Sequence, residues 1–505
     1  MRSLASIAFA FGTIVPFCTA NGKSDVIYRD VAVIGGGASG AYAAVRIRND
    51  FHKSIALIEK QEILVSHLDH FLAQITSANF IILPISDQDV NATGQGGMVD
   101  TYVDKTGKIF DYGVQGFLNV SGATDVFARF NISIGSGATS PSLTTKYIDF
   151  RTGDKVEFQP PSSAKQIAAI AKFLKVIEPW ESMLFPGYWD FPAPSDIPED
   201  FLIPFGEFLL KYGLEDGAPI IYSSTGLGVG NMSETTTMFA LQSFGWDMAR
   251  ALTGQMGLFT PASGGNQALY NAVAKDLGND VLYSSTVVKS HRTNKGVTLT
   301  VRNHKTKKQT TIHARRLLVA IEPTNDNVKP LDLSAFESKT LSKFVYSNEF
   351  AGLVDNPVFN TSSYYYNLPS SAAPDNTLVY QEDPMVASFQ YTGLNNLFRV
   401  MVIGNTTTTA EEAKALSQES FNTLLQAGQF SSEQDQELSW ASFATHGPMH
   451  ARVTVEHVKE GFFQDLYRLQ GARSTWWTGG AFSANFQTQL WKFNEGLIPK
   501  ILKGL

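Results

Sequence analysis

Short apolar runs separated by glycine-rich turns open the chain. Residues 31–34, Val-Ala-Val-Ile, form an apolar β-branched run that is typical of a buried parallel strand. Residues 41–48 follow a turn and have the pattern of a helix, and residues 54–58, Ser-Ile-Ala-Leu-Ile, indicate a second strand. The pattern therefore predicts a βαβ unit over about residues 26–60, in which the two strands run parallel.

Amphipathic helices and proline-rich connections distinguish residues 120–255 from this unit. One helix is expected to begin with a capping box, Ser163-x-x-Gln166, and to end before Pro179. Its apolar positions recur at helical spacing: 167, 170, 171, 174 and 177. This stretch is therefore predicted to begin a second domain.

Strands return after residue 256. Residues 281–288 predict a strand, residues 289–315 a basic hairpin, and residues 317–321 a buried strand that ends before Pro323. Residues 475–482 lead into a final helix through Leu502. The predicted fold class is α/β (α+β), with a Rossmann-like domain and an interleaved second domain. We expect the first domain to comprise residues 26–119, 256–329 and 441–505, and the second to comprise residues 120–255 and 330–440.

The first turn of the predicted βαβ unit has the spacing Gly35-x-Gly37-x-x-Gly40. Glycines there let backbone N–H groups at a helix N-terminus approach a pyrophosphate. Glu59 lies 19 residues after Gly40, at the end of the second strand, where a carboxylate can bind an adenosine ribose. The sequence thus predicts a dinucleotide site, and the alternative is a glycine-rich turn in an ordinary α/β fold. The candidate residues in this unit are Gly35, Gly37, Ala38, Ser39, Gly40, Glu59 and Lys60.

Composition limits the classes of function. The 505 residues are 43% hydrophobic and 17% charged, enough for a large core in more than one domain. The net charge of −7 gives no basic surface of the kind that binds nucleic acid. Aromatic residues make up 12% of the chain, which suits a large apolar ligand cavity as well as the core. The expected partner is therefore a small-molecule substrate.

The first 20 residues have the pattern of a secretory signal peptide. Arg2 precedes an apolar run at residues 4–17, and residues 18–20, Cys-Thr-Ala, suit cleavage. The only cysteine, Cys18, would leave with the signal, which excludes disulfides, a thiolate nucleophile and a cysteinyl–flavin bond from the mature chain. No later apolar stretch is long enough to span a membrane. Glycosylation sequences also favour secretion: Asn119, Asn131, Asn231, Asn360 and Asn405.

With these motifs the chain resembles the flavin-containing amine oxidase superfamily. That group joins a GxGxxG unit to a second glycine pair after the acidic strand end, represented here by Gly96-Gly97. A glycine pair before a helix, Gly264-Gly265, and a C-terminal pair, Gly479-Gly480, continue the resemblance. Within the superfamily the chain looks similar to secreted fungal FAD oxidoreductases of the β-cyclopiazonate dehydrogenase type.

The resemblance implies an FAD-binding domain of the amine oxidase type and transfer of a hydride from a substrate to FAD. It departs from the superfamily in residues 345–354, which lack the lysine found near the flavin in many members. Dehydrogenase and oxidase chemistry therefore both stay open. Residues 480–482, Gly-Ala-Phe, also lack the acid that often contacts the ribityl chain. Further residues that the resemblance places at FAD are Gly96, Gly97, Met98, Val99, Val287, Gly479 and Gly480.

An unexpected segment separates Glu59 from Gly96, where the superfamily has only a handful of residues. Residues 65–95 have the features of a translated intron: Val65-Ser66 can be encoded by the donor sequence GTA-AGT and Gln95 by the acceptor CAG. Removing them deletes 31 codons in frame. We therefore predict a retained intron, with a genuine surface loop as the alternative. His67-x-Asp69-His70 lies in this segment, and we assign no metal site.

The sequence contains few features that identify catalytic residues. His446, in Ala-Thr-His-Gly-Pro-Met, is a candidate base, although a lone histidine is commonly structural. Trp476 and Trp477 are candidates to line the flavin face or to pack in the core. The predicted function is FAD-dependent hydride removal from a small amine- or indole-type secondary metabolite. Two alternatives are a thioether oxidase similar to prenylcysteine oxidase and a non-catalytic or defective FAD-fold protein.

Overall fold

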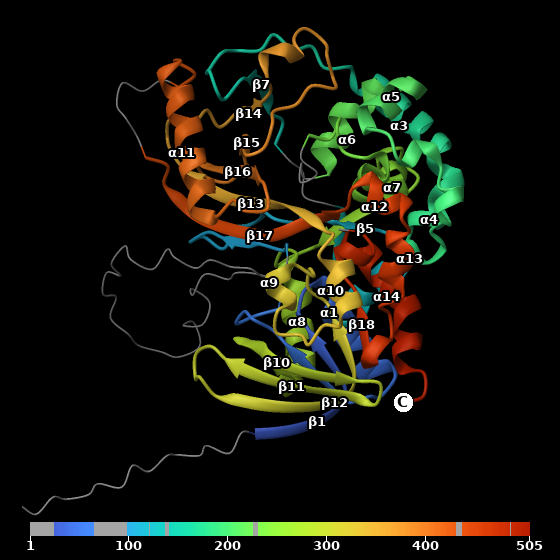
Figure 1. Ribbon diagram of the computed structural model, residues 1–505. Helices are drawn as coiled ribbons and strands as arrows, with labels where there is room; N and C mark the ends of the chain where they lie inside the picture. Colours follow the sequence, from blue (N-terminus) through green and yellow to red (C-terminus); the bar gives the residue numbers. More distant parts are fainter. Residues whose placement is uncertain are drawn as a thin grey trace, which may run out of the picture.

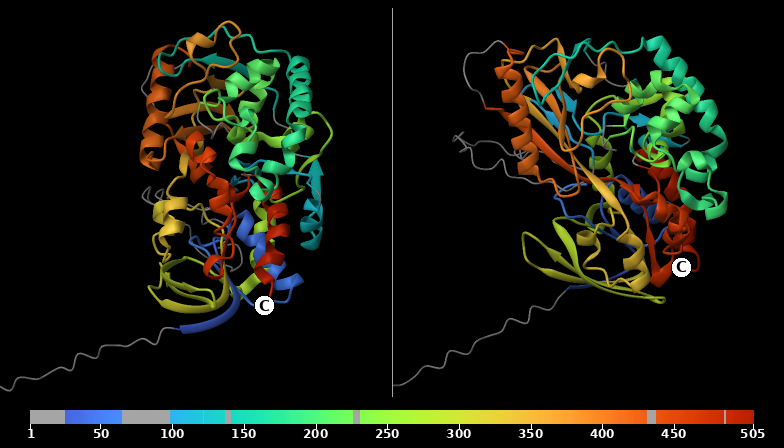
Figure 2. Two further views of the ribbon diagram at one scale, coloured as in Figure 1. Left: turned by 45° about the vertical axis from the view of Figure 1, so that its right-hand side comes forward. Right: turned by 45° about the horizontal axis from the view of Figure 1, so that its top comes forward.

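The computed structural model describes residues 25–64, 98–120, 122–136, 141–225, 231–430, 437–484 and 486–505. Two large sheets and a helical module organise these residues (Figure 1). In Figure 1 the first sheet lies in the lower half, the second sheet at the upper left, and the green helices of the module at the upper right. Both views in Figure 2 keep the three parts in this arrangement. The predicted combination of helices and sheets in an α/β fold is confirmed.

The first sheet contains the predicted βαβ unit. Its strands are β1 (Asp25–Ile34), β2 (Ile55–Ile58), β9 (Val281–Leu282), β10 (Ser285–Thr293), β11 (Gly296–Asn303), β12 (Gln309–Val319) and β18 (Thr475–Trp477). The parallel part of the sheet has the order β18-β12-β1-β2-β9, and the antiparallel strands β11 and β10 extend it beyond β12. The apolar runs of β1 and β2 are fully buried, as the pattern predicted.

Helix α1 (Ala38–Val45) packs against β1 and β2 of this sheet and contacts α8 (Gln267–Leu277) and α14 (Gln487–Leu502). Three further helices are α2 (Ala123–Arg129), α9 (Asn325–Val328) and α10 (Ala335–Leu341). A π-helical turn, Arg46–Asp50, continues α1. The helix predicted at residues 41–48 and the final helix are therefore both present. Within the described ranges, no helix is both long and apolar enough to cross a membrane.

The second sheet is mainly antiparallel. Its order is β17-β13-β16-β15-β14-β7, formed by β7 (Thr144–Ile148), β13 (Val345–Asp355), β14 (Ser363–Asn367), β15 (Met385–Tyr391), β16 (Leu397–Gly404) and β17 (Trp440–Arg452). Helix α11 (Ala410–Gln426) covers one face (Figure 1) and closes a core that contains Phe350, Val400 and Val402. Because β17 pairs with β13, residues 441–452 belong to this sheet, although the sequence analysis assigned them to the first domain.

The helical module fills most of residues 163–252. Its helices are α3 (Ser163–Ile177), α4 (Glu181–Leu184), α5 (Phe205–Tyr212), α6 (Ala218–Ser224) and α7 (Thr237–Leu252), with 3-10 turns η2 (Glu178–Trp180), η3 (Tyr188–Asp190), η4 (Pro194–Asp196), η5 (Glu199–Phe201) and η6 (Glu215–Gly217). Helix α3 has the predicted length, but its N-cap is Ser162, whose side chain accepts a hydrogen bond from Lys165. The predicted capping box is therefore wrong, and Gln166 instead donates to the carbonyl of Pro161.

Short elements connect the large parts. They are β3 (Thr101–Val103), β4 (Ile109–Asp111), β5 (Phe117–Leu118), β6 (Ile134–Ser136), β8 (Leu258–Pro261), α12 (Val455–Lys459), α13 (Phe462–Tyr467), η7 (Gly278–Asp280), η8 (Ser370–Ala372), η9 (Ala472–Ser474) and η10 (Gly480–Phe482). Strands β5, β8 and β6 form a small sheet. Strand β5 precedes the predicted boundary at residue 120, β6 follows it, and β8 comes after the helical module in the chain. The small sheet therefore pairs the segments that precede and follow the helical module.

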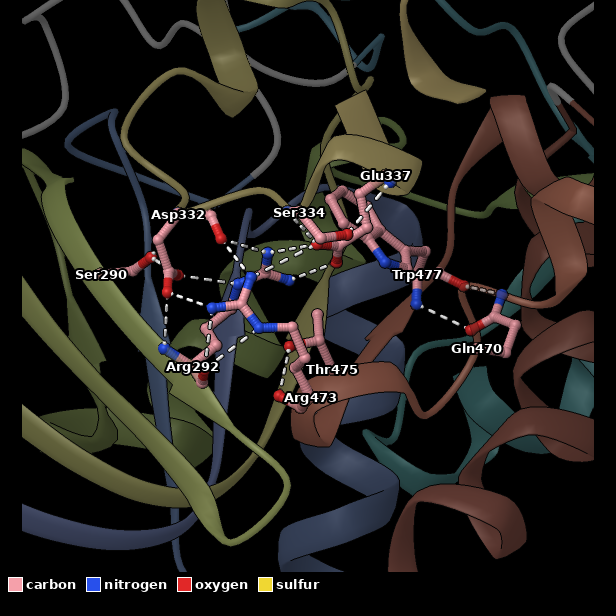
Figure 3. Close-up of polar contacts among 9 residues, drawn as sticks. All are labelled: Ser290, Arg292, Asp332, Ser334, Glu337, Gln470, Arg473, Thr475 and Trp477. Atoms are coloured by element: carbon pink, nitrogen blue, oxygen red, sulfur yellow. Dashed lines mark hydrogen bonds and ion pairs between the residues drawn. The ribbon is translucent and has the colours of Figure 1, made fainter. Parts of the chain in front are cut away.

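Two arginines fasten α10 to the first sheet (Figure 3). Arg292 on β10 is fully buried and donates two hydrogen bonds, of 2.9 and 3.0 Å, to the carboxylate of Glu337. It also donates from Nε to Asp332, over 3.1 Å. Arg473, in η9, donates to both carboxylates as well. This network fixes the start of β18 and therefore the position of the glycines that follow it.

Candidate functional site

The three glycines of the first turn meet different surroundings. Gly35 has φ +98°, and a Cβ there would lie 2.7 Å from the carbonyl oxygen of Ala320. A Cβ on Gly40 would lie 1.9 Å from the carbonyl oxygen of Gly35, so only glycine lets α1 pack this closely. Gly37 differs, because a Cβ there would have no atom within 4 Å. The side of the turn at Gly37 is open, as a bound pyrophosphate requires.

The turn and the C-terminal glycines meet in space, although about 440 residues separate them. Ser39 Oγ and Thr478 Oγ1 are 2.7 Å apart. Asn494 on α14 donates to Ser39 Oγ over 2.9 Å and lies 2.9 Å from Thr478 Oγ1. This buried network places Gly479-Gly480 beside the N-terminus of α1. That N-terminus has no side-chain cap, and Trp491 donates to the carbonyl of Ala38.

Glu59 closes the other side of the turn. One carboxylate oxygen accepts from the N–H of Gly36 over 2.7 Å, and the other accepts from the N–H of Gln61 over 2.7 Å. Burial raises the pKa of this carboxyl, while burial lowers the pKa of the neighbouring Lys60. The backbone of Glu59 accepts from Ser285, which brings the buried Val287 of β10 to the same end of the sheet. Binding of an adenosine ribose by Glu59 stays a prediction.

A carboxylate also reaches the C-terminal glycines, from a part of the chain that the sequence analysis did not consider. Glu322 follows β12 and lies close to Gly480 and Ala481, whose backbone N–H groups act to lower the pKa of its carboxyl. Burial nevertheless raises the pKa of Glu322 to about 7. Glu322 therefore brings an acid from a neighbouring strand end close to residues 479–481. An isolated acid in the run Leu-Val-Ala-Ile-Glu-Pro was the available signal.

Gly96 and Gly97 lie outside the described residues, as do residues 65–95 and the candidate metal-binding motif in them. Met98 and Val99 are described, and Val99 is buried. Among the described residues no group of three or more His, Cys, Asp or Glu side chains is placed to hold a metal ion.

The retained-intron prediction is tested by the transcript. Sequencing mature message is expected to show residue 64 joined to residue 96, and a protein without residues 65–95 is expected to fold better and to contain more FAD. The physical reason is the apolar content of the segment, Phe71-Leu72 and Phe80-Ile-Ile-Leu, which stands in the sequence between two predicted parts of a cofactor site. Mature message that keeps these codons would overturn the prediction.

A cavity of about 410 Å³ lies between the second sheet, strands β5 and β8 of the small sheet, and the helical module. Its volume is within the usual range for small-molecule sites. The second sheet contributes one face of the wall, α6 and α7 contribute small polar side chains, and the start of α14 contributes Gln487 and Thr488. Met98, next to the predicted glycine pair, lines it as well. The cavity therefore adjoins a residue that the resemblance places at FAD.

His446 lines this cavity and is paired with an acid. Its Nε2 lies 2.8 Å from Asp100 Oδ2, and both side chains are almost fully buried. Burial alone would lower the pKa of His446, but the hydrogen bond and charge of Asp100 outweigh it and leave the pKa raised. His446 is the additional residue of a β-bulge, because Glu349 pairs with Gly447 and Phe350 with Thr445. Bulges of this kind turn a side chain toward a site.

Trp476 and Trp477 are core residues of β18 and are not among the residues that line this cavity. The guanidinium of Arg316 lies 5.6 Å from the centre of the Trp476 ring. Trp477 is fully buried and stacks on Phe482 at a centroid distance of 5.9 Å. Both side chains are buried, and lining of the flavin face by either of them stays a prediction.

Three ionisable cavity residues were missed by the sequence analysis: Glu349 on β13, Arg399 on β16 and His450 on β17. Burial raises the pKa of Glu349 to about 7, although the charges of His446 and Arg399 act to lower it. Burial also lowers the pKa of Arg399. A glutamate within the apolar strand at 345–354 was the only local sign of the pair Glu349 and Arg399.

Known proteins resemble the chain over nearly its whole length. The family model described as flavin containing amine oxidoreductase matches residues 94–485. The β-cyclopiazonate dehydrogenase of Aspergillus flavus is 29% identical over 504 residues, with 99% of this chain and 97% of that protein covered. The FAD-dependent oxidoreductase dpchF of Colletotrichum higginsianum is 30% identical over 521 residues, with 100% and 97% covered.

Solved structures share the fold. A fatty acid isomerase from P. acnes that produces CLA superposes with a TM-score of 0.67 at 14% identity, covering 94% of this chain and 99% of that one. A putrescine oxidase bound to putrescine superposes with a TM-score of 0.59 at 13% identity, covering 95% and 100%. At this identity the likeness concerns the fold alone.

Proposed function

Since the chain belongs to the family of flavin-containing amine oxidoreductases and is an FAD-dependent oxidoreductase, we propose that it takes a hydride from a small amine- or indole-type secondary metabolite. The observation that supports this proposal is the cavity of about 410 Å³, which adjoins the predicted FAD site and combines apolar walls with ionisable groups. Oxidation of such a metabolite requires this combination, because the ring system needs apolar contacts and its nitrogen needs a polar partner.

The residues present fit FAD. The open side of Gly37 and the uncapped N-terminus of α1 would hold the pyrophosphate, and Glu59 would bind the adenosine ribose. When bound, FAD supplies the acceptor for a hydride. The chain must exclude water and hold the reacting carbon, which the walls from the second sheet, the small sheet and the helical module support. Burial acts to lower the pKa of His446, but the hydrogen bond and charge of Asp100 raise it and so favour the protonated form inside the cavity.

A product assay tests the proposal. Purified protein with its FAD is mixed without oxygen with an alkylamine, an indole-bearing amine and a prenyl thioether. We expect loss of flavin colour with the amine or the indole, and a product that lacks one hydride and one proton. Reaction with the thioether alone would contradict the proposal and favour the thioether-oxidase alternative.

We also propose that the protein enters the secretory pathway and is cleaved after residue 20. Exposure of Asn119, Asn131, Asn360 and Asn405 supports this, since glycosylation requires an accessible side chain. Expression in a eukaryotic host tests it. The expected result is secreted protein whose mass falls on treatment with an endoglycosidase, whereas unglycosylated protein that stays in the cell would contradict it.

A further inference from the structure

The second sheet directs two charged side chains into the cavity. Strands β13 and β16 are antiparallel neighbours, with Glu349 opposite Ile403 and Leu353 opposite Arg399. Directly paired residues point to the same face of a sheet, and every second residue along a strand does so too. Glu349 and Arg399 therefore share one face with Met401, and all three line the cavity. Their neighbours Phe350, Val400 and Val402 point to the opposite face and enter the core under α11.

The polar atoms of this pair are incompletely satisfied by the protein. Glu349 is 4% exposed, and its Oε2 has no hydrogen-bond partner among the described residues. The buried Nε of Arg399 has none there either. Buried polar atoms nearly always have partners, because losing water without replacement costs free energy. Two such atoms of opposite charge, lining one cavity, point to a ligand that supplies both a donor and an acceptor.

We propose that Arg399 binds a planar anionic oxygen group of the substrate, a carboxylate or an enolate, while Glu349 accepts the proton from the substrate's N–H. The inference deepens the proposed function and rests on it: the substrate is an amine or indole that also carries an acidic oxygen group. Arg399 suits this group because a guanidinium binds two oxygens side by side. Its neighbour across the sheet surface, Glu349, then faces the nitrogen.

The oxidation step balances with these groups. Bound FAD would supply the acceptor for a hydride, which would take the electron pair of the C–H bond next to the nitrogen. The lone pair of the nitrogen forms the new C=N bond, and the N–H proton bonds to Glu349 Oε2. Two titratable residues act directly on the pKa of Glu349, and a third is paired with one of them. His446 on β17 and Arg399 on β16 lower its pKa, and Asp100 holds His446 from behind. His450 on β17 also lines the cavity, and burial lowers its pKa to about 3, which leaves it neutral.

The anion site is tested by binding rather than by turnover. Indole-3-acetate and its neutral analogue indole-3-acetamide are titrated calorimetrically into the protein with its FAD. We expect the acetate to bind about 10- to 100-fold more tightly than the amide, as hydrogen bonds to charged groups allow. Arg399→Met should abolish this preference, and Arg399→Lys should keep part of it. The matched control is Arg302→Met on exposed β11, which should keep all of it.

The base is tested by comparing wild type with Glu349→Gln at two pH values. At about pH 5.5 Glu349 is protonated, so both proteins should bind indole-3-acetate equally. At about pH 8.5 the ionised carboxylate repels the anion, so Glu349→Gln should bind severalfold more tightly. His446 is present in both proteins, and because ionised Glu349 helps to raise the pKa of His446, the loss of Glu349 at high pH reduces the charge on His446 and opposes part of this gain. With a substrate, the rise of kcat/KM near pH 7 should also disappear in Glu349→Gln.

The inference and the proposed function fail separately. An acetate preference that survives Arg399→Met and Arg399→Lys, or a binding ratio for Glu349→Gln that does not change with pH, would overturn the inference even if amines or indoles are oxidised. Loss of the preference in Arg399→Met, with the pH-dependent ratio, supports it even if the tested amines and indoles are not substrates. Flavin content and thermal unfolding establish that each variant is folded.

Discussion

Replacing Gly37 with valine is expected to abolish FAD binding and to leave the fold intact. Gly37 has φ −65°, which every L-residue adopts, and a Cβ there meets no protein atom within 4 Å. The valine side chain would instead occupy the space where the pyrophosphate approaches the backbone. Visible absorbance of the purified variant should show flavin near background. Added FAD should no longer stabilise the variant. In wild type, a free FAD concentration of 1,000 times the Kd should raise the free energy of unfolding by about 4 kcal/mol.

The matched control is Gly496→Ala on the exposed side of α14, where a Cβ also meets no atom within 4 Å. It should keep wild-type flavin content. Gly40 differs from Gly37, because even the Cβ of an alanine at Gly40 would clash with the backbone of Gly35 and disturb folding. Wild-type flavin content in Gly37→Val would remove this turn from the FAD site.

Replacing Arg292 with methionine is expected to cost about 3–5 kcal/mol of unfolding free energy, the usual effect of removing one partner from a buried ion pair. Methionine fills much of the space but leaves the carboxylate of Glu337 buried without the two hydrogen bonds that Arg292 donates (Figure 3). Urea unfolding at neutral pH measures the loss. Arg302→Met, on the exposed side of β11, should change stability by less than about 0.5 kcal/mol.

The pH dependence separates this effect from lost packing. Burial acts to raise the pKa values of Asp332 and Glu337. Hydrogen bonds outweigh burial and leave both pKa values lowered: Asp332 accepts from Ser290 and Arg292, and Glu337 accepts from Arg292. Groups whose pKa falls on folding stabilise the protein above their unfolded pKa, near 4, and lose that contribution as the pH falls. The difference between wild type and Arg292→Met should therefore shrink below about pH 4. A difference that stays constant down to acid pH would show that the ion pair contributes little.

Local signals predicted the nucleotide-binding unit well. The apolar runs of β1 and β2, the glycine turn and the acid at the end of β2 lie within 35 residues, so neighbouring residues determine their structure. Boundaries were less accurate. Residues 161–163 are Pro-Ser-Ser, and either serine satisfies the N-cap pattern, so the sequence could not choose Ser162. Strand β17 was assigned to the wrong sheet because its pairing with β13 is a long-range contact.

The cavity could not be predicted from local pattern. His446 was noted, but its partner Asp100 is 346 residues away, and their pairing depends on a β-bulge and on the close approach of Gly113. Glu349 and Arg399 come together only through the register of β13 with β16. A one-residue slip in that register would turn Arg399 into the apolar core under α11. The sequence shows these residues as single charges within apolar strands and gives no sign that they share a site.

The most direct test of the account is the flavin content of the purified protein before and after acid precipitation. Cys18 is the only cysteine and precedes the described residues, so FAD cannot be attached through cysteine in the folded part of the chain. We predict one FAD per chain, all of it released into the supernatant by acid. A colourless protein that takes up no added FAD, or a flavin that stays with the precipitated chain, would contradict the account.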